Sequence, residues 1–298
     1  MNVQRKYMVE TVLNLVKNDY VFHKSTGELG SSFFCGLDEE KYKRTDYLFK
    51  ATRQDFSKIL TVMNCIEDTY TMYRENRFSR PYFEIGNPAL EEIACHIEYL
   101  FTKFRVIIEY MEEILSICIP PILPEDKKKE YDEMLKKKGP KAKVNRFDYL
   151  LEYISTNDDE HKKILNTKWF QDFRENRNFL VHKGASCLVY GDKTEILFSV
   201  MKIDEMERED EINIDTYFLT DNMLIRYRRF WGIMISELIL FCEAIFEFLL
   251  SKASIVEEQK YFLDISNYSK RMIRTEDNSD KQTVLETMLN SILREDTI

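Results

Sequence analysis

Glycine and proline are scarce in this chain, with 8 and 6 among 298 residues. Loop-rich β-sandwiches, collagen-like chains and disordered chains contain far more of one or both, so the composition excludes those classes. Hydrophobic residues make up 44% of the chain and aromatic residues 13%, which is enough to bury one large core or two modest ones. The composition therefore indicates a folded globular protein of one or two domains.

Metal-binding and nucleotide-binding motifs are also missing. The six cysteines lie far apart, with no CxxC pair, so we expect reduced, mostly buried thiols and no zinc site. The absence of GxxxxGK[ST] and GxGxxG disfavours nucleoside triphosphatases and dinucleotide enzymes. Glu92 and His96 share a helix face, but a ferritin-like site needs a second such pair, so we expect solvated surface there. No metal and no cofactor are expected.

No segment of the sequence resembles a signal peptide or a membrane span. The most apolar window, 231–250, contains Glu237, Glu243 and Glu247. Each would cost about 3 kcal/mol at membrane depth, so the window predicts a bundle helix. We expect a soluble, cytoplasmic protein with no membrane partner. The net charge of −9 also argues against coating nucleic acid through bulk charge, although a local RNA site remains open.

Two long apolar stripes predict the main helices. From Pro88 to Cys118 apolar residues recur at steps of three and four, with Asn87 as the expected N-cap. A second stripe runs from Leu224 to Phe248, and Asp221 is its expected cap. Two stripes of this length are typical of an antiparallel bundle whose helices cross at about 20°.

Shorter elements fill the rest of the chain. Further helices are expected at 6–18, 42–77, 146–155 and 167–183, with a last short helix ending near Arg294. Segments 187–190 and 196–200 flank Gly191-Asp192-Lys193 and predict a β-hairpin. The expected linkers are the lysine-rich stretch 127–143, the acidic run 204–215 and the polar segment 275–281. Stretch 127–143 has an alternative interpretation, as a basic arm that reaches a phosphate backbone.

Together these elements predict an all-α fold, an antiparallel helical bundle with a small β-hairpin insertion. We divide it into a helical N-terminal extension (1–85), the bundle (86–252, with the hairpin near 186–203) and a C-terminal helical tail (253–298).

The stretch from Trp169 to Gly184 carries the residues best suited to chemistry. Its apolar positions Phe170, Phe173 and Leu180 leave a gap four residues after Phe173, and Arg177 occupies that gap. A guanidinium on a packing stripe has to be paired, because an unpaired buried charge is costly. Either a carboxylate such as Glu109 or Glu243 pairs it, or the stripe opens into a cleft that holds an anion.

His182 lies in the last turn of the same expected helix, where the carbonyl end of the helix dipole favours the imidazolium form. Asn178 precedes it by four residues, on the same face. A proton-transferring histidine beside an anion-binding arginine suits phosphodiester chemistry without a metal. Arg177 and His182 are separated by roughly 140° around the helix and about 7.5 Å along it. Two copies facing each other across a two-fold axis would bring both to one phosphate.

Arg177-Asn178-x-x-x-His182 resembles the RNxxxH signature of the HEPN family (higher eukaryotes and prokaryotes nucleotide-binding). The resemblance covers roughly 88–251 and implies an all-helical bundle with the signature near the end of its third main helix, facing a dimer cleft. Many members are metal-independent endoribonucleases acting as toxins, in antiviral defence or in stress response. The resemblance implies that Arg177 stabilises phosphorane-like charge and His182 acts as general base or acid. Asn178 would orient the phosphate or the histidine.

The leading functional hypothesis is thus a metal-independent endoribonuclease, a homodimer with a composite site, whose partners are RNA and an antitoxin or regulatory protein. The alternative is a non-catalytic HEPN-type nucleotide-binding or protein-interaction module. Arg174, Arg226, Arg228 and Arg229 are weaker candidates for RNA binding, with solvated surface as the alternative. Arginines in a first helical turn oppose the helix dipole, which favours a local anion or carboxylate partner.

Overall fold

The structure is a computed structural model that describes residues 1–18, 21–30, 32–33, 37–75, 87–155, 165, 170, 185–191, 195–202, 215–255 and 279–295. Its helices are α1 (Val3–Asn18), α2 (His23–Leu29), α3 (Glu39–Glu75), α4 (Pro88–Cys118), α5 (Glu125–Leu135), α6 (Pro140–Ser155), α9 (Tyr227–Lys252) and α11 (Ser279–Glu295). Its strands are β1 (Ser32–Phe33), β2 (Ala185–Gly191), β3 (Ile196–Lys202), β4 (Ile225–Arg226) and β5 (Ser254–Ile255). The chain is mostly all-α with small antiparallel sheets, which confirms the expected fold class.

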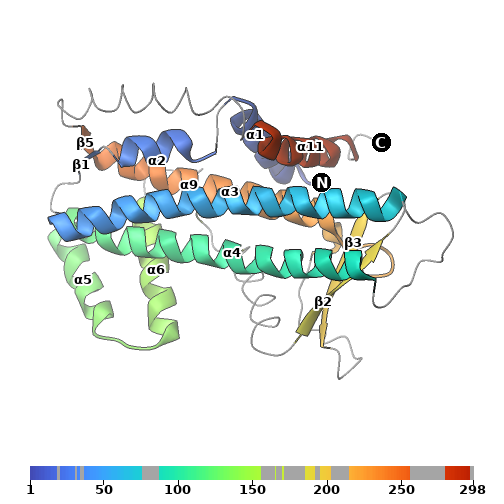
Figure 1. The fold of residues 1–298 in the computed structure, drawn as a ribbon. Coiled ribbons are helices and arrows are strands. Elements are labelled where there is room, and N and C mark those ends of the chain that lie inside the picture. Colours follow the sequence, from blue (N-terminus) through green and yellow to red (C-terminus); the bar gives the residue numbers. More distant parts are fainter. Residues whose placement is uncertain are drawn as a thin grey trace.

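Helices α3 and α4 lie side by side and antiparallel along the length of the molecule (Figure 1). The predicted start of α4 is confirmed, because the Asn87 side chain accepts a hydrogen bond from the Ala89 N–H at 3.0 Å and Pro88 occupies the first turn. The helix ends at Cys118, before the 3₁₀ turn Pro120–Ile122. Its buried face is wider than the predicted stripe, since Phe101, Ile108 and Leu115 are buried as well.

Helix α9 forms the centre of the core. Every residue from Phe230 to Ser236 is buried, so this part of the helix is covered all round, as expected of a helix that is apolar on every side. It contacts α4 as well as α1, α2 and α11, which lie on its other side (Figure 1). Buried residues of α1, α3, α4, α9 and α11 belong to one hydrophobic cluster. The division into extension, bundle and tail remains a prediction.

The predicted start of α9 is wrong. The helix begins at Tyr227, and Asp221 lies in an exposed turn instead of capping it. Ile225 and Arg226 are extended because they pair with Phe198 and Leu197 of β3. Their backbone therefore belongs to the sheet. In the sequence, apolar residues of a short strand that directly precedes a helix cannot be distinguished from one more turn of that helix.

The expected linker at 127–143 is also wrong, because α5 and α6 form a helical hairpin there that projects from one end of the bundle (Figure 1). Tyr131 is buried and stacks on Tyr149, with ring centroids 6.2 Å apart. The Tyr149 hydroxyl also hydrogen-bonds to Glu130 at 2.9 Å. Gly139 has φ 102°, a left-handed conformation that glycine adopts at little cost, and it permits the turn between the helices. The lysines themselves remain exposed, as predicted.

The β-hairpin is confirmed, with register from Ala185 opposite Lys202 to Gly191 opposite Ile196. The helices expected at 6–18, 42–77 and 146–155 correspond to α1, α3 and α6. The last helix is confirmed as α11, but it starts at Ser279, so the expected hinge 275–281 overlaps it. Of the helix expected at 167–183 only Phe170 is described, and of the acidic run 204–215 only Asp215. In the described part of the chain, every helix is too short or too polar to cross a membrane.

Candidate functional site

The residues of the signature, Arg177, Asn178 and His182, lie outside the described residues, as does Arg174. One residue of the same stretch is placed. Phe170 is buried in the hydrophobic cluster, as its apolar position predicted, and the guanidinium of Arg105 on α4 lies 5.5 Å from its ring centroid. A cation over an aromatic face is attractive, so this contact fixes Phe170 to the middle of α4.

The other flank of the signature also contacts α4. At the start of β2, the N–H of Cys187 donates a hydrogen bond to the Glu98 carboxylate at 2.9 Å. Glu98 and Arg105 are two helical turns apart on α4, about 10 Å along the axis. The chain therefore enters and leaves the signature segment beside the same stretch of one long core helix.

Both carboxylates considered as partners of Arg177 are already engaged. Glu109 forms an ion pair with Arg105, in which Oε1 of Glu109 lies 2.9 Å from Nε of Arg105. Glu243 accepts hydrogen bonds from the backbone N–H of Phe22 at 3.3 Å and from the Ser25 hydroxyl at 2.7 Å. The contacts of Glu243 tie α2 to α9, so this carboxylate has a structural role.

The three arginines at the start of α9 are each paired with a carboxylate from a different element. Arg226 pairs with Glu195, just before β3. Arg228 makes two parallel hydrogen bonds to Glu67 of α3, at 3.0 and 2.7 Å, and these bonds raise the pKa of its guanidinium.

Arg229 pairs with Glu295 of α11 at 2.9 Å and lies over the ring of Tyr217. The carboxylate partner that the helix dipole favours is thus confirmed for Arg228 and Arg229 in the first turn of α9, and Arg226 has one as well although it lies in β4. An RNA phosphate would have to displace a carboxylate at each of them.

These pairs belong to a polar junction that the sequence did not reveal. The Tyr70 hydroxyl of α3 donates to the backbone carbonyl of Glu195 at 2.8 Å. Tyr73 packs so closely on Gly191 that a Cβ there would lie 2.6 Å from its ring. Burial raises the pKa of the Tyr227 hydroxyl well above its ordinary range. The junction fixes the end of α3, the hairpin and the start of α9 in one arrangement.

A second polar cluster joins α3 to α4. The Asp55 carboxylate, with 5% of its side chain exposed, accepts from Lys58 at 2.7 Å, from Lys103 at 3.0 Å and from the Tyr110 hydroxyl at 3.1 Å. Burial alone would raise the pKa of Asp55, but the two lysines outweigh it and hold that pKa below its ordinary value. Burial and the Asp55 charge raise the pKa of Tyr110 to about 12. All charges here are paired, so the cluster is a structural tie between the helices.

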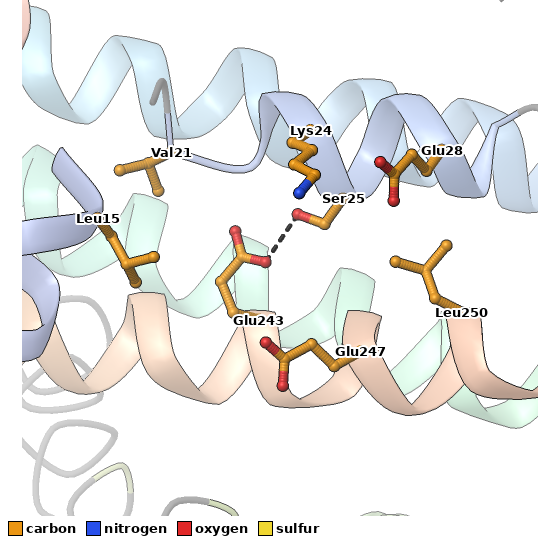
Figure 2. Close-up of a pocket in the computed structure, with 8 residues that line it drawn as sticks. All are labelled: Leu15, Val21, Lys24, Ser25, Glu28, Glu243, Glu247 and Leu250. Atoms are coloured by element: carbon orange, nitrogen blue, oxygen red, sulfur yellow. Dashed lines mark hydrogen bonds between the residues drawn. The ribbon is translucent and has the colours of Figure 1, made fainter. Parts of the chain in front are cut away.

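A small cavity of about 170 Å³ lies between α2 and α9, with Leu15 and Val21 at one end (Figure 2). Figure 2 shows Glu243 directed at Ser25 and Glu247 beside it on α9. The remaining lining residues are Lys24, Glu28 and Leu250. Three carboxylates against one lysine repel a phosphate group, so this cavity does not fit an RNA backbone.

The described residues contain no group of three or more side chains that could hold a metal ion. Glu92 is exposed, as expected, but His96 is half-buried, and its Nδ1 is buried without a hydrogen-bond partner in the described part of the chain. Among the described cysteines, Cys118, Cys187 and Cys242 are buried, Cys65 is intermediate and Cys95 is exposed; all carry free thiols.

The chain matches no protein-family model, and comparisons with curated proteins and with solved structures find no significant relative.

Proposed function

We propose that this protein is a metal-independent endoribonuclease of HEPN type, acting as a homodimer in the cytoplasm. The observation that carries the proposal is the sequence Arg177-Asn178-x-x-x-His182. Two features of the structure support it: the chain is mostly helical, and both described flanks of the signature, Phe170 and Cys187, contact the long helix α4.

The chemistry needs two proton transfers and one anion-binding group. His182 of one copy accepts the proton of a ribose 2′-hydroxyl, and that oxygen attacks the adjacent phosphorus. The bond from phosphorus to the 5′-oxygen breaks, and His182 of the partner subunit gives its proton to the leaving oxygen. Arg177 stabilises the negative charge that develops on the phosphoryl oxygens, and Asn178 orients the phosphate. The products carry a 2′,3′-cyclic phosphate and a 5′-hydroxyl.

An endoribonuclease of this kind in a cell has to be kept inactive until it is needed. We therefore propose that the protein acts as a toxin or defence effector, held in check by an antitoxin or another regulatory protein.

The second candidate is a non-catalytic nucleotide-binding or protein-interaction module. One observation favours the protein-interaction module: Arg226, Arg228 and Arg229 are each neutralised by a carboxylate, so these arginines offer no unpaired cation to the phosphates of RNA or of a nucleotide.

Incubating purified protein with mixed cellular RNA in EDTA tests the proposal, with Arg177→Ala and His182→Ala compared at equal concentration. We expect cleavage by the wild type, loss of cleavage in both variants and 2′,3′-cyclic phosphate ends on the products. An oligonucleotide with a single 2′-deoxyribose before the scissile phosphate should resist cleavage at that bond.

Cleavage that survives both substitutions would place the activity elsewhere and contradict the proposal. Folded dimers of all three proteins that cleave no RNA, while binding nucleotide or a partner protein, would favour the non-catalytic module.

A further inference from the structure

The turn between α5 and α6 carries a concentrated positive charge. Residues 136–146 contain six basic and no acidic side chains, in a chain whose net charge is −9. We call this segment the basic tip. Its basic residues are Lys136, Lys137, Lys138, Lys141, Lys143 and Arg146.

Four of these side chains have no carboxylate partner. Lys136, Lys137, Lys138 and Lys141 are exposed, and none forms an ion pair with a described carboxylate. The other two basic residues serve the fold. Lys143 pairs with Glu112 of α4 at 3.2 Å, and Arg146 donates to the backbone carbonyl of Lys137 at 3.2 Å.

The dipole of α5 favours Lys136, Lys137 and Lys138, which follow its last residue, but the stability of the fold does not explain Lys141. Lys141 lies in the first turn of α6, which contains no acidic residue, and a cation there opposes the helix dipole. Three consecutive lysines also repel one another. An anion bound at the tip would relieve both effects.

The backbone of the tip is ordered by its own hydrogen bonds. The N–H of Lys136 donates to the carbonyl of Glu133 at 3.3 Å, and that of Lys137 to the carbonyl of Met134 at 3.1 Å. The N–H of Lys143 donates to the carbonyl of Gly139 at 3.2 Å. The lysines therefore extend from a folded turn, at the end of a projection from the bundle (Figure 1).

The tip is separate from the flanks of the signature. Its anchor on α4, Glu112, is seven residues beyond Arg105, about 10 Å along the helix axis, and fourteen beyond Glu98. The tip itself extends outward from α4 (Figure 1). A long polymer can contact both regions, whereas a small ligand cannot.

We propose that the basic tip binds the phosphate backbone of single-stranded RNA and holds the substrate while it is cleaved elsewhere. The identification of the bound polymer as RNA rests on the function proposed above. Lysine ammonium groups contact phosphates as point charges. Residues 136–146 contain no aromatic side chain for stacking on bases, so recognition is by the backbone and independent of sequence.

The test is binding of a fluorescently labelled single-stranded RNA, measured by anisotropy on His182→Ala protein, which keeps the probe intact under the proposed mechanism. The tip variant replaces Lys136, Lys137, Lys138 and Lys141 with Glu. A matched control makes the same change of charge elsewhere on the surface, at Lys6, Lys24, Lys128 and Lys252.

Each phosphate contact to a single strand contributes about 0.7 to the slope of log affinity against log salt. Four contacts contribute a slope of about 3, so wild-type binding should weaken at least about 50-fold between 50 and 200 mM salt. We expect the tip variant to lose most of that salt dependence and to bind at least about tenfold more weakly at low salt, with the control close to wild type. In the cleaving protein, the tip variant should raise KM and leave kcat unchanged.

Equal RNA binding by the tip variant and the wild type overturns the inference, and so does equal loss in the control. Binding to phosphatidylserine vesicles that exceeds binding to RNA and disappears in the tip variant would assign the tip to a membrane surface instead. The experiment separates the two proposals. RNA binding that depends on the tip, without any cleavage, supports the binding role of the tip and counts against the proposed ribonuclease activity. Cleavage with an unchanged KM in the tip variant supports the ribonuclease activity and rejects the binding role of the tip.

Discussion

Two basic clusters lie near opposite ends of α4, and they differ in whether their charges are paired with carboxylates. At the start of α9, Arg226 and Arg228 are held by carboxylates of other elements and help to fix the hairpin and α3 in place. At the tip of the α5–α6 hairpin, the lysines at 136–138 and Lys141 have no carboxylate partner in the described part of the chain. The first cluster is part of the fold, whereas the second is available to a ligand.

The difference shows why counting basic residues is a poor guide to a polyanion site. A paired guanidinium is already satisfied, and a phosphate gains little by replacing its carboxylate. An exposed, unpaired lysine loses only its hydration when it binds a phosphate, and the nucleic acid releases its condensed counterions. Substitutions that remove the paired charges should therefore affect stability, and substitutions at the tip should affect binding.

The largest effect is expected at the buried tie between α3 and α4. Asp55→Ala leaves Lys103 and the Tyr110 hydroxyl without their shared acceptor, and removing one partner of a buried ion pair costs about 3 kcal/mol. Urea denaturation measures this loss in the free energy of unfolding. Asp46→Ala is the control on the same helix: its partner Lys50 is exposed, so the change should stay within about 0.5 kcal/mol. Equal costs at both positions would show that the Asp55 cluster is not a structural tie.

The arginine junction should show the next largest effect. Glu67→Ala removes both hydrogen bonds to the half-buried Arg228, and we expect a loss of about 2 kcal/mol in the free energy of unfolding. Glu113 provides a matched control, because it makes the same two-bond contact to Arg44, at 2.6 and 2.7 Å, on an exposed surface. Glu113→Ala should cost less than about 0.5 kcal/mol. Similar losses in the free energy of unfolding for the two variants would show that the pair of Arg228 with Glu67 stabilises the fold no more than an exposed ion pair does.

Acid should weaken the Asp55 tie selectively. The folded-state pKa of Asp55 is lowered, so its contribution to stability is present above the ordinary carboxyl pKa and is lost as pH falls through the folded value. The effect lies below about pH 4. The free energy of unfolding of the wild type should fall more steeply with acid there than that of Asp55→Asn, which cannot titrate at this position. Parallel pH profiles for the two proteins would contradict the lowered pKa.

Local signals in the sequence were sufficient for α4, because Asn87, Pro88 and the apolar stripe are all contained within that one segment. They failed where a distant partner decides the structure. Ile225 became a strand because β3 is available to pair with it, and α5 became a helix that buries only Tyr131, against Tyr149 of α6.

The same limit applies to charge. Arg228 and Glu67 are 161 residues apart in the sequence, so no spacing rule could join them. The helix dipole indicated only that some carboxylate or other anion was needed. The role of Arg177, Asn178 and His182 as a catalytic site remains a prediction from sequence, since only the flanks of this signature are described.

The smallest effect tests one residue of the tip directly, because it asks whether the fold itself needs Lys141. Lys141 lies at the N-terminal end of α6 and Lys252 at the C-terminal end of α9, so the same substitution should have opposite signs at the two positions. Lys141→Glu should stabilise the protein by about 0.5 kcal/mol, and Lys252→Glu should destabilise it by a similar amount. Shifts in the urea midpoint measure both. If Lys141→Glu is instead destabilising, the lysine stabilises the fold, and its charge is explained without a bound anion. If it is stabilising, the chain retains a cation that its own fold disfavours, as expected of a residue kept for binding an anion.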